Sequence, residues 1–208
     1  MHADEIAAAL LELGSATLGE SGAAPLAPRI RAIWPGARLA AQAYPVSCVP
    51  GDNLAVHVAV TRAPRGSALV VDVGEERERG FWGEVLTVAA KARELAGLVI
   101  DGGVRDTDAL AQHRFPVFAS GVVLRGASKK GPGSAGMPAR VGEVRVQRGD
   151  WVVGDADGVA IVPFAALERV LTAARARAAR EQQLFAELRA GRTTVDLLEL
   201  DPAQVETD

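Results

Sequence analysis

Residues 97–106 read GLVIDGGVRD, and this segment decides the fold. Its apolar first half is typical of a buried β-strand, which Gly102-Gly103 is predicted to end. A second strand-like run, ALVVDV, occupies residues 68–73. Apolar residues at helical spacing predict a helix over 82–95, with Trp82 facing the core, after a polar loop at 74–83. The order strand, helix, strand predicts a βαβ unit whose two strands are parallel.

The rest of the chain continues this alternation of helices and strands. We expect one α/β domain over residues 1–208, with no internal repeat or linker and with a long C-terminal helix. Outside the βαβ unit, the patterns predict helices over 3–20, 54–63 and 164–190, strands over 39–49, 115–120, 151–154 and 158–162, and a glycine-rich loop over 126–138.

Composition excludes several classes of function. The formal net charge is −3, and Lys and Arg do not gather on one segment, so we expect no nucleic-acid binding. The apolar runs are short and the N-terminus lacks the pattern of a secretory signal, so we expect no membrane span and a cytoplasmic protein. The single cysteine, Cys48, excludes an internal disulfide. With only three histidines in the chain, carboxylates and water are the expected ligands of any metal, which favours Mg²⁺ or Mn²⁺.

The βαβ unit predicts where a site should form. Both strands end at the same edge of the sheet, and the connecting helix begins there. The Arg105-Asp106 loop should therefore lie beside the helix N-terminus, which is formed by Gly83, Glu84, Val85 and Leu86. Ligand sites of α/β sheets tend to occupy this edge.

These residues suit a small anionic keto acid. Backbone N–H groups at a helix N-terminus bind carboxylates, and the Arg105 guanidinium can hold a carboxylate or an enolate oxygen. Asp106 can carry a divalent cation, while Glu84 can hold the water shell of that cation or move a proton. Simpler alternatives remain open: Arg105 and Asp106 as a surface ion pair, Gly102-Gly103 as a tight turn, and Glu84 as an acid that stabilises the helix dipole. The residues predict an anion-and-metal site without choosing a reaction.

A family resemblance narrows that choice. The stretches WGEV at 82–85, AAKAR at 89–93 and LVIDGGVRD at 98–106 resemble the RraA-like family, which includes the 4-hydroxy-4-methyl-2-oxoglutarate / 4-carboxy-4-hydroxy-2-oxoadipate aldolases. Those aldolases carry an acid, twenty residues and then Arg-Asp, and Glu84 with Arg105-Asp106 reproduces the spacing. The acid is Asp in the best-known members, so Glu84 is a departure, with one extra methylene in its side chain.

The resemblance also implies a fold, a chemistry and an assembly. It implies a compact β/β/α swivelling-type domain in homotrimers or hexamers, with active sites between subunits, to which Glu20 would contribute. Residues 83–86 and Arg105 would bind pyruvate, and Asp106 would bind Mg²⁺ or Mn²⁺. The implied reaction is cleavage of a 4-hydroxy-2-oxo acid to pyruvate and a second oxo acid. Oxaloacetate decarboxylation is an expected side activity because it passes through the same enolate.

Two alternatives stay open within that family. Some members regulate a ribonuclease or helicase by binding to it, which is a role without catalysis. Retention of the acid, the Arg and the Asp at aldolase spacing argues against that role here. A different enolate-forming lyase or decarboxylase would use the same residues and cannot be separated by sequence.

Overall fold

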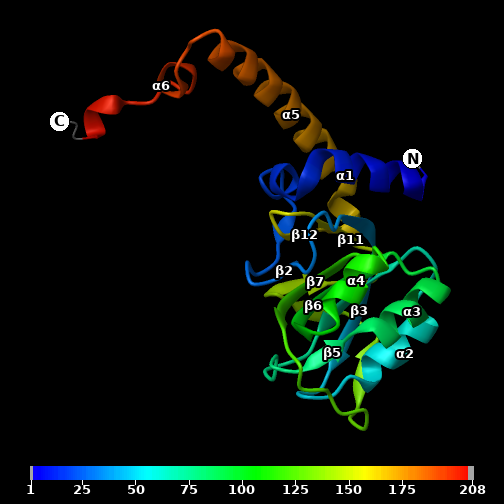
Figure 1. The fold of residues 1–208 in the computed structure, drawn as a ribbon. Coiled ribbons are helices and arrows are strands. Elements are labelled where there is room, and N and C mark those ends of the chain that lie inside the picture. The colour runs from blue at the N-terminus through cyan, green and yellow to red at the C-terminus, as the bar shows by residue number, and fades with distance from the viewer. Residues whose placement is uncertain (1, 206–208) are drawn as a thin grey trace.

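A curled mixed β-sheet forms the centre of the computed structural model, which describes residues 2–205 (Figure 1). The strands are β1 Ala24–Pro25, β2 Arg31–Ala32, β3 Leu39–Cys48, β4 Ala68–Asp72, β5 Gly80–Trp82, β6 Gly97–Val104, β7 Val117–Val122, β8 Gly133–Ala135, β9 Ala139–Val141, β10 Val144–Val146, β11 Trp151–Gly154 and β12 Val159–Val162. The helices are α1 Ala3–Gly19, α2 Leu54–Arg62, α3 Glu84–Ala92, α4 Thr107–Gln112, α5 Leu167–Arg189 and α6 Thr194–Leu197, with short 3₁₀ turns at Phe164–Ala166 and Pro202–Gln204.

The predicted βαβ unit is present and lies in the middle of the sheet. The sheet order is β1-β12-β11-β3-β4-β6-β7-β2, with β5 paired to β6 and β8 paired to β3. Strands β4 and β6 are parallel, in a register that runs from Ala68 opposite Gly97 to Asp72 opposite Asp101. Their carboxyl ends therefore meet at one edge, as the sequence predicted.

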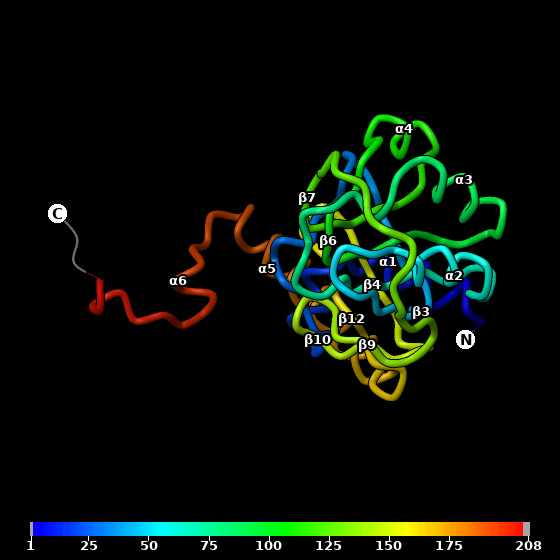
Figure 2. The backbone as a smooth tube through the Cα atoms, turned by 90° about the horizontal axis from the view of Figure 1, so that it is seen from below, coloured from blue at the N-terminus to red at the C-terminus, as the bar shows by residue number. Residues whose placement is uncertain are grey.

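Successive residues of β6 face two different cores, which explains its continuous apolar sequence. Leu98 and Ile100 pack in a cluster with side chains of α2 and α3, whereas Val99 packs with Val141 and Val146 of the β9–β10 hairpin. Asp101 follows Val99 on the second face, because side chains two residues apart in a strand point the same way. Figure 2 shows α2, α3 and α4 gathered on one flank of the molecule.

Three predicted boundaries around this unit were wrong. The segment 74–83 is not all loop, because its last part forms β5. Trp82 is fully buried in that strand and not in the helix, which begins at Glu84 and ends at Ala92. Gly102-Gly103 does not end β6, which continues to Val104. A Cβ atom on Gly103 would lie 2.6 Å from the carbonyl oxygen of Arg79, so the glycine lets the β5 segment approach β6.

The remaining predictions agree with the structure apart from some short elements. Strands β11 and β12 form the predicted antiparallel hairpin. The predicted strand at 115–120 is shifted to β7, and the glycine-rich loop 126–138 contains the short strand β8. Helix α4 and the β9–β10 hairpin were not predicted. The overall architecture is the expected mixed α/β domain with a long C-terminal helix.

Helix α5 begins on the body and then projects from it (Figure 1). Its buried residues all lie in the first eight positions, and α1 packs against it there. The later turns and α6 extend away from the sheet (Figures 1 and 2). No helix in residues 2–205 has the length and apolar character needed to cross a membrane.

Candidate functional site

The backbone fixes Arg105 and Asp106 at the end of β6. The N–H of Arg105 donates to the carbonyl oxygen of Trp82 at 2.9 Å, which extends the pairing of β5 with β6. Asp106 then adopts a left-handed conformation, with φ of 60°, and its carbonyl oxygen accepts the N–H of Leu110 in the first turn of α4. This change of direction carries the chain out of the sheet and leaves both side chains nearly half exposed, at 46% for Arg105 and 44% for Asp106.

Helix α3 begins directly beside Asp106. The backbone N–H of Glu84 donates to Oδ2 of Asp106 at 3.0 Å, so the N-cap residue of α4 satisfies one of the unpaired donors of α3. A Cβ atom on Gly83 would collide with the same carboxylate oxygen, and only glycine permits this approach. The structure thus brings the predicted helix N-terminus and the Arg105-Asp106 loop together.

The other predicted residues of this helix contribute in different ways. The side chain of Val85 is 80% exposed, whereas that of Leu86 is packed in the core. The first hydrogen bond of the helix joins the N–H of Thr87 to the carbonyl oxygen of Gly83. The N–H groups of Val85 and Leu86 precede it and have no acceptor within residues 2–205. They are the donors that a carboxylate at this helix end would use.

The Glu84 carboxylate contacts a residue that the sequence did not single out. Its Oε1 lies 3.2 Å from Nε2 of His113, at the end of α4. The carbonyl oxygen of His113 in turn accepts Nζ of Lys91 from α3 at 2.7 Å. The two contacts bind α3 to α4 near the surface. Because 29 residues separate Glu84 from His113, no local pattern reveals the pair.

Arg105 is held by packing more than by its neighbouring acid. Its Nε lies 3.9 Å from Oδ2 of Asp106, which is too long for a hydrogen bond. A Cβ atom on Gly80 would lie 3.3 Å from Cδ of Arg105, and one on Gly126 would lie 3.4 Å from its Nη1. The side chain therefore lies along the backbone of two glycines, and within residues 2–205 its guanidinium forms no hydrogen bond.

A buried layer supports the exposed site. Trp82 stacks on Phe115 with ring centroids 5.9 Å apart, and its Nε1 donates to Oγ1 of Thr87 at 2.7 Å. The indole thus joins β5 to the first turn of α3 and to the segment that precedes β7. These contacts connect the backbone of the site to the hydrophobic core.

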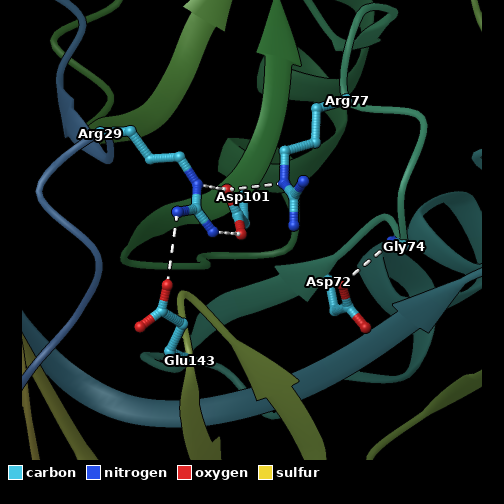
Figure 3. Close-up of polar contacts among 6 residues, drawn as sticks. All are labelled: Arg29, Asp72, Gly74, Arg77, Asp101 and Glu143. Atoms are coloured by element: carbon cyan, nitrogen blue, oxygen red, sulfur yellow. Dashed lines mark hydrogen bonds and ion pairs between the residues drawn. The ribbon is translucent and has the colours of Figure 1, made fainter.

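A second charged cluster lies farther back along β6 (Figure 3). The Asp101 carboxylate is only 3% exposed and accepts Nε of Arg29 at 2.8 Å and its Nη2 at 2.6 Å. Nε of Arg77 lies 3.2 Å from Oδ1 of the same carboxylate, and Nη1 of Arg29 lies 3.8 Å from Glu143. Nearby, Asp72 accepts the N–H of Gly74 at 2.9 Å.

The charges around Asp101 set its ionisation. Burial alone would raise the pKa of its carboxyl group, but the hydrogen bonds and positive charge of Arg29, with a smaller effect of Arg77, lower it below its ordinary value. The hydrogen bond to Asp101 likewise raises the pKa of Arg29. No pattern in the sequence indicates this cluster, because Arg29, Arg77 and Asp101 lie in three separate segments.

The donor set at the site fits a hard divalent cation held mainly by water. Asp106 keeps Oδ1 free of hydrogen bonds within residues 2–205, while the Glu84 carboxylate is 54% exposed. No group of three or more His, Cys, Asp or Glu side chains with metal-binding geometry occurs in this part of the chain. Mg²⁺ and Mn²⁺ often bind through one or two carboxylates, with water and substrate completing the shell. The predicted role of Glu20 remains untested, and its carboxylate pairs with Arg177 of α5.

Comparison with known proteins matches the chain to one family and to named relatives. The family model "RraA-like: Aldolase/RraA" matches residues 8–161. A relative from Halalkalibacterium halodurans, named "Putative 4-hydroxy-4-methyl-2-oxoglutarate aldolase", is 36% identical over 137 residues, which is 66% of this chain and 65% of that protein. The match thus spans slightly less than two thirds of that relative's length.

Two solved structures share the fold. An uncharacterized protein from Pseudomonas syringae pv. tomato str. DC3000 superposes with a TM-score of 0.83 at 26% identity, over 92% of both chains. The RNA-processing inhibitor RraA from Thermus thermophilis superposes with a TM-score of 0.61 at 27% identity, over 68% of this chain and 85% of that one.

Proposed function

The chain belongs to the RraA-like family, and from this premise we propose that it is a divalent-metal-dependent aldolase of the cytoplasm. Its substrates would be 4-hydroxy-2-oxo acids such as 4-hydroxy-4-methyl-2-oxoglutarate, cleaved to pyruvate and a second oxo acid. One observation carries the proposal. The Arg105 guanidinium and the Asp106 carboxylate lie side by side, nearly half exposed, at the N-terminus of α3, and no ion pair shorter than 3.9 Å neutralises either of them in the described part of the chain.

Each group has a part in this reaction. The free N–H groups of Val85 and Leu86 orient the substrate carboxylate, with help from the helix dipole. Cleavage of the carbon–carbon bond places negative charge on the oxygen of the pyruvate enolate. Arg105 stabilises that charge, and a donor fixed where charge develops lowers the barrier to reaction. Glu84 is the acid placed to move a proton, once it leaves His113.

Asp106 would hold the Mg²⁺ or Mn²⁺ ion. The bound cation supplies a Lewis acid that stabilises the enolate oxygen. The bond from the Glu84 N–H orients the Asp106 carboxylate and leaves Oδ1 available. Decarboxylation of oxaloacetate produces the same enolate, and we propose it as a side activity.

We further propose that the protein acts as a homotrimer or hexamer. Exposed apolar side chains lie close to the site: Val85 and Val88 of α3, at 80% and 50% exposure, and Val122 and Leu124 at and beyond the end of β7, at 58% and 86%. The projecting end of α5 and α6 adds Phe185, Leu198 and Leu200. Burial of such surface favours association. A second copy would also shield the exposed site from water.

A non-enzymatic role is the second candidate. The Thermus thermophilis relative is named as an RNA-processing inhibitor, and the projecting C-terminal arm offers a surface for a ribonuclease or another protein. The aldolase is favoured because a regulator has no need of an exposed Arg-Asp pair beside free helix donors.

Pyruvate release decides between the two candidates. The assay uses 4-hydroxy-4-methyl-2-oxoglutarate and, separately, oxaloacetate, each with Mg²⁺ and with EDTA. The test variant is Asp106→Ala, and the matched control is Asp108→Ala, which removes an exposed acid two residues away on α4. Metal-dependent release that persists in the control and disappears in Asp106→Ala supports the lyase. No release from either compound by folded, metal-supplied protein rules it out and favours the regulator.

A further inference from the structure

Two arginines share the buried Asp101 carboxylate, but they bind it unequally (Figure 3). Arg29 comes from the segment before β2 and contacts both oxygens, at 2.8 and 2.6 Å. Arg77 comes from the loop between β4 and β5 and contacts one oxygen through Nε at 3.2 Å. Without Arg77, Asp101 would keep its bidentate partner and stay satisfied. Without Arg29, most of its hydrogen bonding would be lost.

Arg77 also contacts β6 through its backbone. Its carbonyl oxygen accepts the N–H of Gly103 at 3.0 Å, on the strand that carries Asp101. The loop therefore lies against the end of β6 through both the backbone and the side chain of one residue. Because Arg29 alone contacts both oxygens of Asp101, loss of the Arg77 contact should affect the loop more than the carboxylate.

The loop leads directly to the surface on which Arg105 lies. Gly80 follows it, and its N–H donates to the carbonyl oxygen of Arg125 at 2.7 Å. Arg79 also reaches across, with Nη1 3.4 Å from the carbonyl oxygen of Gly126. Gly80 and Gly126 are the residues whose backbones border the Arg105 side chain. A shift of the loop would therefore move the Gly80 backbone, against which the Arg105 side chain packs.

We propose that Arg77 is a positioning residue for the site. Its ion pair with Asp101 holds the 74–79 loop against β6, and the loop then fixes the Gly80 backbone that directs the Arg105 guanidinium. This inference rests on the proposed function, because Arg105 is assigned there as the group that stabilises the charge of the enolate.

The cluster is better suited to positioning than to binding a ligand. Its surrounding pocket holds three guanidinium groups and three carboxylates, from Arg29, Arg77, Arg140, Asp72, Asp101 and Glu143. These charges balance, and the most buried of them is already fully hydrogen-bonded. A ligand that bound at Asp101 would have to displace Arg29 or Arg77 from its carboxylate.

The test compares three variants of the full-length protein. Arg77→Gln removes the charge, Arg77→Lys restores it without the planar fork, and Arg140→Gln removes an exposed charge of the same pocket that forms no ion pair within residues 2–205. Amide hydrogen exchange over residues 74–83 reports the loop directly. Steady-state release of pyruvate from 4-hydroxy-4-methyl-2-oxoglutarate reports the site.

We expect Arg77→Gln to keep a melting temperature close to that of the wild type and to exchange faster over 74–83. Its kcat/KM should fall by between about tenfold and a hundredfold, the cost of misplacing a substrate-orienting group. Arg77→Lys should recover part of this loss, and Arg140→Gln should match the wild type.

Failure of this inference is distinct from failure of the proposed function. If the wild type cleaves the substrate and Arg77→Gln matches Arg140→Gln in both exchange and kcat/KM, the positioning role is overturned. If the wild type cleaves nothing, the proposed function fails, and exchange over 74–83 alone decides whether Arg77 holds the loop. Exchange equal to that of Arg140→Gln overturns the inference in that case also.

Discussion

Strand β6 contains Asp101, and Asp106 lies two residues beyond the end of the strand at Val104. Arginines lie beside both aspartates. The Asp101 side chain is 3% exposed and holds Arg29 at 2.6 Å. The Asp106 side chain is 44% exposed, and Arg105 lies 3.9 Å away. Residue types are the same in both pairs, while burial and distance differ sharply.

The comparison shows why one pair is structural and the other is available for chemistry. A buried carboxylate must be matched by donors, and Asp101 has them on both oxygens. In Asp106, Oδ2 accepts the N–H of Glu84, whereas Oδ1 accepts no hydrogen bond within residues 2–205 and faces solvent. A ligand can therefore enter the Arg105-Asp106 pair at small cost, whereas at Asp101 it would have to replace an arginine.

Loss of the Asp101 charge should have the largest effect. Asp101→Asn removes the buried charge that accepts two hydrogen bonds from Arg29 and pairs with Arg77. Two hydrogen bonds between charged groups together contribute about 3 kcal/mol of unfolding free energy. Asp106→Asn, by contrast, should change it by less than about 1 kcal/mol, since the amide oxygen can still accept the Glu84 N–H. Urea unfolding of both variants at pH 7 measures the difference. Equal losses would mean that burial does not separate the two pairs.

Next in size is an effect on turnover. Arg105→Lys keeps the positive charge but loses the planar fork that binds carboxylates and enolates. We expect kcat/KM to fall about a hundredfold, the usual cost of losing one donor to a developing oxyanion. Unfolding free energy should stay at the wild-type value because Arg105 has no tight partner. A variant that loses stability but keeps its turnover would reverse the roles assigned to the two pairs.

The sequence predicted that Asp106 lies at the candidate site, but it did not indicate the charged cluster around Asp101. Strand–helix–strand order in residues 68–106 was enough to bring Glu84 beside Asp106, because parallel strands end at a common edge. Nothing comparable links Arg29 to Asp101, since 72 residues separate them and neither lies in a periodic pattern that the other shares. Tertiary contacts of this kind become visible only when the chain is folded.

The wrong predictions for Trp82 and for Gly102-Gly103 also result from contacts between distant segments. Trp82 fits the apolar period of a helix, but its stacking on Phe115 and the pairing of β5 with β6 place it in a strand. Gly102-Gly103 reads as a break, yet Gly103 is needed because another chain segment passes within van der Waals distance. In both cases packing with a distant segment overrides the local preference.

Acid should lower the free energy of unfolding, because it protonates buried carboxylates that are stable when charged. The pKa of Asp101 is lowered, and that of Asp52 falls to about 2 because the N–H groups of Leu54, Lys130 and Gly131 outweigh the effect of burial. A lowered pKa in the folded state adds stability above the unfolded value, which is about 4, and this stability is lost as the carboxylate is protonated. We therefore expect unfolding free energy to decrease from about pH 4 toward pH 2.

Variants assign that acid loss to particular residues. Urea unfolding across this range should show a shallower pH dependence in Asp101→Asn and in Asp52→Asn than in the wild type. Slopes in both variants equal to that of the wild type would show that these two carboxylates do not cause the loss of stability in acid.

The smallest expected effect concerns the contact between Glu84 and His113. Both side chains are partly exposed, at 54% and 30%, so their coupling should be about 0.5 kcal/mol or less. A double-mutant cycle with Glu84→Gln and His113→Gln measures it.

Glu84→Asp tests the role of Glu84 in the reaction, because the shorter side chain does not reach His113 but keeps an acid at the N-terminus of α3. If Glu84 serves the reaction, Glu84→Asp should retain turnover and Glu84→Gln should lose it, with both variants as stable as the wild type. Equal turnover in the two variants would leave Glu84 as a helix-terminal acid, and catalysis would then depend on the Arg105-Asp106 pair alone.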